Sequence, residues 1–243
     1  MKTALCLYGQ PRNFSSNYNF IYKNVIEPNN CDVFFHAWYD ETDTSLKKMT
    51  PGHEHRHLEP NLQNILPDVL NPKKFILEKQ KNFLRKEVFV SEENMELIWP
   101  WAKVYNRDTF IKDTVHRHYS MWYSIQQSIL LKELYAQENG FEYDCIFLSR
   151  FDVSPKIPIY MNNYNLNKII TPNMDLPRNE INDWFLFTNN KNINIVSTTF
   201  NLIDFYRDKI IEENGSWTNE AYLREQVKLF NIEIDHQDLN VTF

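Results

Sequence analysis

The sequence predicts an α/β fold in which a mixed but mostly parallel sheet is flanked by helices. Two short apolar runs, Thr3–Tyr8 and Asp32–Trp38, have the composition of buried strands, and a segment with helical spacing lies between them. A strand, a helix and a second strand within about 40 residues indicate a βαβ unit with parallel strands. No repeat, linker or shift in composition divides the 243 residues, so we expect one domain over 1–243.

The elements of the first half follow from apolar spacing and from turn residues. Asn13–Val25 has helical periodicity and ends before Pro28. Tyr39–His57 is polar and predicts a loop. The other elements expected here are a short helix at Asn61–Leu70, a third strand at Lys74–Glu78 and a further strand at Glu87–Val90.

The second half contains the clearest helix, Val115–Asn139. Its aromatic and aliphatic side chains recur every three to four residues, which predicts a packed face, and Gly140 follows as a stop. A strand is expected at Tyr143–Leu148, directly after this helix. The remaining expectations are strands at Lys168–Thr171 and Trp184–Thr188, helices at Asn194–Glu213 and Glu220–Phe230, and a short strand at Ile232–Ile234.

Composition excludes several classes of protein. The net charge of −6 argues against a nucleic-acid partner, because no basic block offsets it. A mean hydropathy of −0.55 and the lack of a 20-residue apolar window predict no transmembrane segment, and the apolar N-terminal run is too short for a signal peptide. Cys6, Cys31 and Cys145 form no paired motif, so we expect reduced thiols and a cytoplasmic location. With four glycines, the chain contains no glycine-rich phosphate loop.

Polar residues follow three of the expected strands, where ligands of open α/β sheets bind. These segments are Gly9-Gln10-Pro11-Arg12, His36–Asp40 and Arg150-Phe151-Asp152. A guanidinium such as that of Arg12 matches phosphate oxygens, and Gly9 allows a ligand to approach the backbone. Asp152 is suited to bind a divalent cation or a sugar hydroxyl. The alternative is that Asp152 only pairs with Arg150 or caps the following turn.

A second carboxylate, Asp183, precedes the strand expected at Trp184–Thr188. An apolar environment can tune such a group into a general base, although a plain turn residue is the alternative. Glu220 at a helix start is favourable helix-dipole chemistry. No G-x-S-x-G sequence occurs, which disfavours a serine hydrolase.

Four segments together resemble a loose group of small bacterial and viral GT-A-type glycosyltransferases. The resemblance lies in the order of the motifs and extends over about Met1 to Phe230. Its segments are Leu7–Phe14, Asp32–Trp38, Tyr143–Val153 and Asn182–Phe187. The family implies a GT-A-like, Rossmann-related domain, with a nucleotide-binding half at about 1–153 and an acceptor half at about 154–243.

The resemblance also implies roles for individual residues. Gly9, Gln10 and Arg12 would contact the nucleotide, and Arg150-Phe151-Asp152 stands where these enzymes carry an Asp-x-Asp metal motif. Arg150 replaces the first Asp, so Mn²⁺ or Mg²⁺ at Asp152 is one expectation and neutralisation of the diphosphate by Arg150 is the other. Asp183 falls near the acceptor-side residues and is the candidate base.

We therefore expect an enzyme that transfers a sugar from a nucleoside-diphosphate donor to a carbohydrate acceptor, in polysaccharide or other glycan biosynthesis. One alternative is a sugar-phosphate nucleotidyltransferase, although Gly9–Arg12 is a poor phosphate loop for one. Another is a non-enzymatic carbohydrate-binding protein with a degenerate transferase fold. The sequence carries no signal for the donor, the acceptor, the stereochemistry or the oligomeric state.

Overall fold

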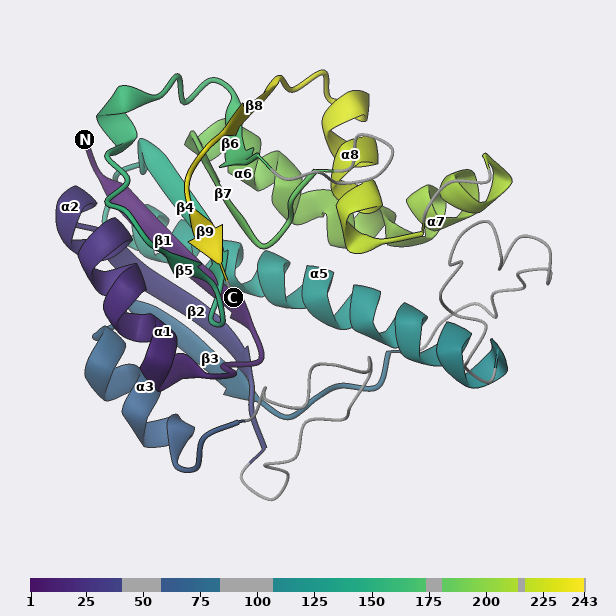
Figure 1. The fold of residues 1–243 in the computed structure, drawn as a ribbon, viewed down its shortest axis with the longest axis horizontal. Coiled ribbons are helices and arrows are strands. Elements are labelled where there is room, and N and C mark those ends of the chain that lie inside the picture. The colour runs from purple at the N-terminus through teal and green to yellow at the C-terminus, as the bar shows by residue number, and fades with distance from the viewer. Residues whose placement is uncertain (41–57, 84–106, 174–180, 214–216, 243) are drawn as a thin grey trace.

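The computed structural model describes residues 1–40, 58–83, 107–173, 181–213 and 217–242. Within them, seven strands form one sheet in the order β3-β2-β1-β4-β7-β6-β8 (Figure 1). The loop expected at Tyr39–His57 falls almost entirely outside the described residues, as does the strand expected at Glu87–Val90. The strands of this sheet are β1 (Thr3–Gly9), β2 (Asp32–Trp38), β3 (Lys74–Glu78), β4 (Cys145–Arg150), β6 (Ile169–Pro172), β7 (Phe185–Thr188) and β8 (Ile234–Gln237).

The sheet is mixed and mostly parallel, as the sequence predicts. The pairs β1–β2, β1–β4, β2–β3 and β6–β8 are parallel. Strand β7 runs opposite to both of its neighbours, β4 and β6. A two-stranded sheet of β5 (Ser154–Pro155) and β9 (Val241–Thr242), which the sequence analysis does not predict, lies beside it.

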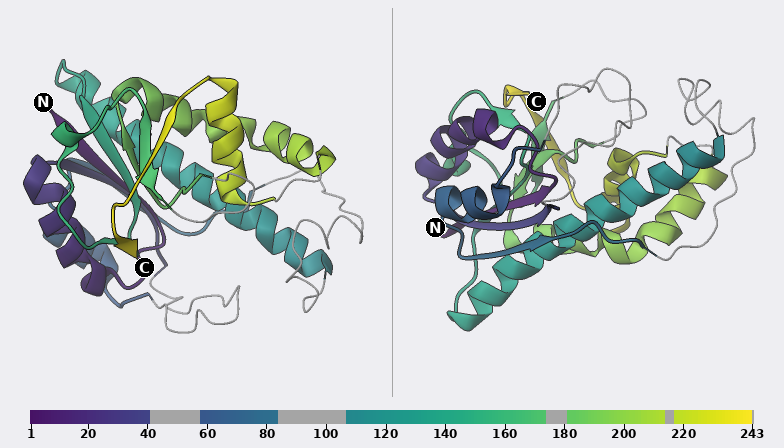
Figure 2. Two further views of the ribbon diagram at one scale, coloured as in Figure 1. Left: turned by 45° about the horizontal axis from the view of Figure 1, so that its top comes forward. Right: turned by 90° about the horizontal axis from the view of Figure 1, so that it is seen from below.

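Helices cover both faces of the sheet (Figure 2). On one side lies a first group near the N-terminus, and on the other lies a second group led by the long α5. The first group is α1 (Phe14–Ile21), the π-helical turn η1 (Tyr22–Ile26), α2 (Glu27–Asn29) and α3 (Leu62–Leu70). The second group is α5 (Arg107–Glu138), α6 (Asn190–Ser197), η5 (Thr198–Leu202), α7 (Ile203–Glu212) and α8 (Asn219–Leu229), and a further 3-10 turn, η3 (Met161–Asn163), follows β5.

Alternation along β1 separates two hydrophobic layers. Leu5 and Leu7 pack with α1 and α3, whereas Cys6 and Tyr8 pack with α5. Because successive side chains of a strand point to opposite faces, a strand buried on both faces is apolar throughout. Trp122 of α5 is fully buried in the second layer, in agreement with the packed helix face that the sequence predicts.

The helix expected at Asn194–Glu213 is divided in the structure. It begins earlier, where the side chain of Asn189 accepts a hydrogen bond from the Asn192 amide and caps α6. It is then interrupted by the 3-10 turn η5. At this break the hydroxyls of Ser197 and Thr198 donate to backbone carbonyls one turn back, and such bonds compete with regular helix.

Helix α5 ends at Glu138, one residue before the expected end at Asn139, and Gly140 follows with a positive φ of 68°. It begins eight residues earlier than expected, at Arg107 instead of Val115. Among the described residues, we find no helix with both the length and the apolar character needed to span a bilayer.

Candidate functional site

The carboxyl ends of β1 and β4 lie side by side. Their parallel register pairs Tyr8 with Arg150, so the Gly9–Arg12 segment and the Arg150–Asp152 segment leave the sheet at the same edge. Gly9 has a φ of 93°, a conformation that side chains rarely adopt, and a Cβ placed there would meet no atom within 4 Å. The backbone at Gly9 is therefore both turned by its glycine and open to an approaching group.

The reversed direction of β7 brings Asp183 to this same edge. The backbone N–H of Arg150 donates to the carbonyl of Trp184 at 3.0 Å, and the Tyr8 hydroxyl donates to the carbonyl of Asp183 at 2.5 Å. The sequence places Asp183 at the start of a strand, and because that strand is antiparallel to β4, its start lies next to the end of β4. Tyr8 of β1, Arg150 of β4 and Asp183 in the turn before β7 thus come together at one edge.

Asn182 fixes the turn that presents Asp183. Its side-chain oxygen accepts from the backbone N–H of Trp184 at 2.8 Å and of Phe185 at 3.3 Å. Asparagine favours such turns because its side chain can bond to the backbone two residues on. Thr171 of β6 donates to the Asn182 carbonyl from the other side, at 3.2 Å. The turn is consequently held at both ends.

Arg150 and Asp152 form a two-pronged ion pair. Arg150 Nε lies 2.8 Å from Asp152 Oδ1, and Arg150 Nη2 lies 2.6 Å from Asp152 Oδ2. The Asp152 side chain is 4% exposed and that of Arg150 is 19% exposed, so the guanidinium is the member of the pair that solvent reaches more. This is the pairing that the sequence analysis gives as the alternative to a ligand role for Asp152. The geometry fixes the guanidinium at the sheet edge, in a pair whose two charges balance.

The pKa values at this edge reflect burial and close charges. Burial would lower the pKa of Arg150, but Asp152, Tyr8 and Asp183 outweigh it and hold that pKa above its ordinary value. Burial raises the pKa of Tyr8 well above its ordinary value, and the carboxylates of Asp183, Asp152 and Glu220 add to this effect. Arg150 is therefore charged and Tyr8 neutral at every physiological pH.

Two residues of this group have little or no signal in the sequence. Glu220, at the start of α8, acts electrostatically on Tyr8, so its carboxylate belongs to the same neighbourhood, although its position suggests only a favourable helix start. Tyr8 is an ordinary strand aromatic in the sequence. Its place directly before Gly9 is the one feature that could have indicated a role.

The other residues expected at the nucleotide follow β1. Gly9, Gln10 and Arg12 are half-buried. The Arg12 amide donates to the carbonyl of Gln10 at 2.8 Å, and Arg12 forms an isolated antiparallel bridge with Leu58. Through this bridge, the residues just before α1 pair with the segment that precedes α3. A common pocket of Arg12 and Asp152 stays a prediction.

The donor atoms around Asp152 do not fit a divalent cation without displacement of Arg150. Both carboxylate oxygens already accept charged hydrogen bonds, and a cation bound there would lie against the guanidinium. Within the ranges that the structure describes, no group of three or more His, Cys, Asp and Glu side chains is placed to hold a metal ion. The metal role expected for Asp152 stays a prediction, and the geometry favours Arg150 as the positive charge.

Comparison with known proteins gives a likeness among solved structures and none by sequence. No family model matches the chain, and no curated protein matches its sequence. Among solved structures, the chain is similar to mouse xyloside xylosyltransferase 1 in its apo form, with 9% identity and a TM-score of 0.43 over 97% of this chain and 84% of that one. At these values the assignment of an activity rests on the residues of this protein.

Proposed function

We propose that this protein is a glycosyltransferase that moves a sugar from a nucleoside-diphosphate donor to a carbohydrate acceptor. The observation that carries the proposal is the Arg150 fork, which Asp152 holds beside Tyr8 and Asp183 at the carboxyl edge of a mostly parallel sheet. This edge is where open α/β sheets bind ligands, and a fixed guanidinium is suited to a diphosphate. The order of the sequence motifs supports the same function.

In the proposed reaction, a bond forms between an acceptor oxygen and the anomeric carbon while the bond from that carbon to the diphosphate breaks. The leaving nucleoside diphosphate takes the electron pair, and Arg150 would offset the charge that develops on it. Asp152 would act as a positioning residue for Arg150, through the two bonds described above. Gly9, Gln10 and Arg12 would contact the nucleotide from the neighbouring strand end.

Asp183 is the proposed base that takes the proton of the acceptor hydroxyl. Its side chain is buried, with 1% of its surface exposed, so this role requires the acceptor to open the turn in front of it. A buried carboxylate beside Tyr8 and Arg150 has the environment in which basicity can be tuned. An Asp183→Asn variant should bind the donor as the wild type does and lose transfer by roughly a hundredfold or more.

The proposal can be tested by measuring the Tm of the protein with each of a panel of nucleoside diphosphates, once with Mn²⁺ and once with EDTA. A ligand at 100 times its Kd adds about 2.7 kcal/mol to the free energy of unfolding, so one nucleotide should raise the Tm clearly. We expect stabilisation in EDTA as well, and its loss in Arg150→Met.

Release of pyrophosphate from a nucleoside triphosphate and a sugar phosphate would instead identify a nucleotidyltransferase. Binding of carbohydrate without donor hydrolysis or transfer would identify a binding protein. Either result would overturn the proposal.

A further inference from the structure

Three hydrogen bonds in series connect the Gly9 amide to a carboxylate on the edge strand β3. Gly9 N–H donates to Ser124 Oγ at 2.8 Å, Ser124 Oγ lies 2.7 Å from His36 Nδ1, and His36 Nε2 lies 2.8 Å from Glu78 Oε1. The series joins β1, α5, β2 and β3. The side chains of His36 and Ser124 are fully buried, so water does not compete for the bond between them, whereas the Glu78 end is partly exposed.

The chemistry of the groups determines which atom is the donor and which the acceptor in each hydrogen bond. The Glu78 carboxylate only accepts, so His36 Nε2 carries a proton and donates it. In a neutral imidazole Nδ1 then accepts, and the Ser124 hydroxyl donates to it while its oxygen accepts from Gly9. We call this series, Glu78–His36–Ser124–Gly9, the relay.

Protonation of His36 would reverse one bond of the relay. Nδ1 would become a donor to Ser124 Oγ, and the serine hydroxyl would turn to the backbone carbonyl of His36, which lies 3.2 Å away. Burial lowers the pKa of His36, although its hydrogen bond to Glu78 works against this. The neutral form therefore prevails near pH 7, and the reversed form belongs to acidic pH.

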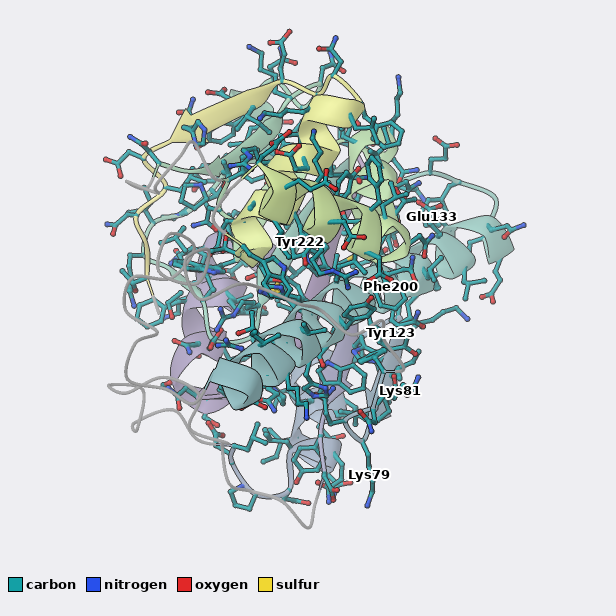
Figure 3. All side chains as sticks on the ribbon, turned by 90° about the vertical axis from the view of Figure 1, so that its right-hand side faces the viewer. Lys79, Lys81, Tyr123, Glu133, Phe200 and Tyr222 are labelled. Atoms are coloured by element: carbon teal, nitrogen blue, oxygen red, sulfur yellow. The ribbon has the colours of Figure 1, made fainter. Side chains whose placement is uncertain are left out.

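The outer end of the relay reaches the surface at Lys81. Its Nζ lies 2.8 Å from Glu78 Oε2 and 4.3 Å from the centre of the Tyr123 ring, and the side chain is 44% exposed. Figure 3 shows Tyr123 between Lys81 and Phe200. Trp38 stacks on Tyr123, and the His36 ring meets both of these aromatic rings edge-on. The titratable groups that face His36 from the described elements around it are Glu78, Lys81 and Tyr123.

We propose that Glu78, His36 and Ser124 are positioning residues that hold the Gly9 amide, set the Gly9–Arg12 turn for the donor diphosphate and make nucleotide binding respond to protonation of the relay. The inference rests on the proposed function for its ligand. Gly9 requires such support because its φ of 93° lies outside the ordinary strand range and its amide points into the core. The Gly9 amide donates to Ser124, so the diphosphate would bind to the Gly9–Arg12 turn that follows and not to this amide.

The Gly9 amide can be observed directly by NMR. The chain has only four glycines, and Tyr8-Gly9 is its one Tyr-Gly pair, so labelling tyrosine with ¹³C at the carbonyl and glycine with ¹⁵N selects this amide. In the wild type, its shift should follow the titration of His36 as the pH falls below about 6.5. Ser124→Ala should move the signal at neutral pH and abolish that titration, and Ser124→Thr should restore both.

Ser128→Ala is the matched control. Ser128 lies one turn further along α5, is also fully buried, and its hydroxyl donates to the Ile125 carbonyl at 2.9 Å, outside the relay. Ser124→Ala should weaken binding of a nucleoside diphosphate about tenfold, because a buried N–H loses its acceptor, whereas Ser128→Ala should not. The inference is overturned if the Gly9 signal of Ser124→Ala matches the wild type, or if both variants bind equally.

Failure of the proposed function gives a different result. If the wild-type protein binds none of the nucleoside diphosphates, both the proposed function and the role of the relay in nucleotide binding are overturned, whatever the Gly9 signal shows. A wild type that binds one of them, together with a Gly9 signal that ignores Ser124, would overturn the relay alone.

Discussion

Replacement of Asp152 by Asn removes one charge from the Arg150–Asp152 pair and keeps the shape of the side chain. In the wild type, two charged hydrogen bonds of 2.6 and 2.8 Å join the groups. After the change, Arg150 keeps its charge, since a guanidinium stays protonated in proteins, but it loses the carboxylate that balances it and that raises its pKa. The variant therefore tests the central contact of the site.

The cost of this change follows from the burial of the two side chains. Removing one partner of a fully buried pair costs about 3–5 kcal/mol. Asp152 is 4% exposed and Arg150 19%, so water can partly solvate the orphaned guanidinium, and we take the lower end, about 3 kcal/mol. For a chain of this size, each kcal/mol lowers the Tm by roughly 2–4 °C, which predicts a drop of roughly 6–12 °C.

Urea unfolding measures the loss in free energy of unfolding, and calorimetry measures the drop in Tm. The matched control is Glu138→Gln, which breaks the pair between Lys74 and Glu138, whose side chains are 30% and 56% exposed. This exposed pair should cost less than about 1 kcal/mol. Arg150→Met combined with Asp152→Asn should cost less than the sum of the two single changes, because no unpaired charge remains.

The reasoning fails if Asp152→Asn unfolds within about 2 °C of the wild type, since a change that small corresponds to an exposed pair. It also fails if the two single changes add without coupling. Either result would mean that Asp152 does not hold Arg150 in solution.

Three further predictions follow from burial and backbone geometry. Burial lowers the pKa of His36 and His118, so the unfolded chain binds more protons than the folded chain below about pH 6.5. Urea unfolding should therefore show that the free energy of unfolding decreases as the pH is lowered through this range. His118→Phe should reduce the slope of that decrease by up to about 1.4 kcal/mol per pH unit. Burial raises the pKa of Cys6 and Cys145 to about 12, so a thiol reagent at pH 8 should leave both unmodified until the protein is unfolded. Gly9→Ala should cost about 1–3 kcal/mol in thermal unfolding, because a side chain is strained at a φ of 93°; an unchanged Tm would contradict this.

Several of the strands could be predicted closely from the sequence. Asp32–Trp38 and Lys74–Glu78 have the expected bounds, and β1 extends the expected strand by one residue. Such segments stand out because polar residues mark both of their ends. The division of the helix after α6 could not be predicted, because it depends on the side-chain hydroxyls of Ser197 and Thr198 bonding back to the chain.

The candidate site could be predicted only in part. Adjacent parallel strands bring the segments after β1 and β4 to one edge, as the strand order suggests. The contact of Asp183 with Tyr8 depends on β7 running in reverse, and its four residues, Phe185–Thr188, carry no signal of direction. The bond between Ser124 and the Gly9 amide joins residues 115 positions apart, so no local pattern could reveal it.

The position of β1 in the interior of the sheet has a consequence for synthesis on the ribosome. Strand β1 emerges first and pairs early with β2, yet its other neighbour ends only at Arg150. At about 5–20 residues per second, the nascent chain waits roughly 6–20 seconds between completing β2 and completing β4. During that interval one edge of a mostly apolar strand has no partner, and such an edge can pair with a neighbouring polypeptide. Recombinant yield should therefore depend on chaperones that shield this edge and on slower initiation, which spaces the ribosomes on the message.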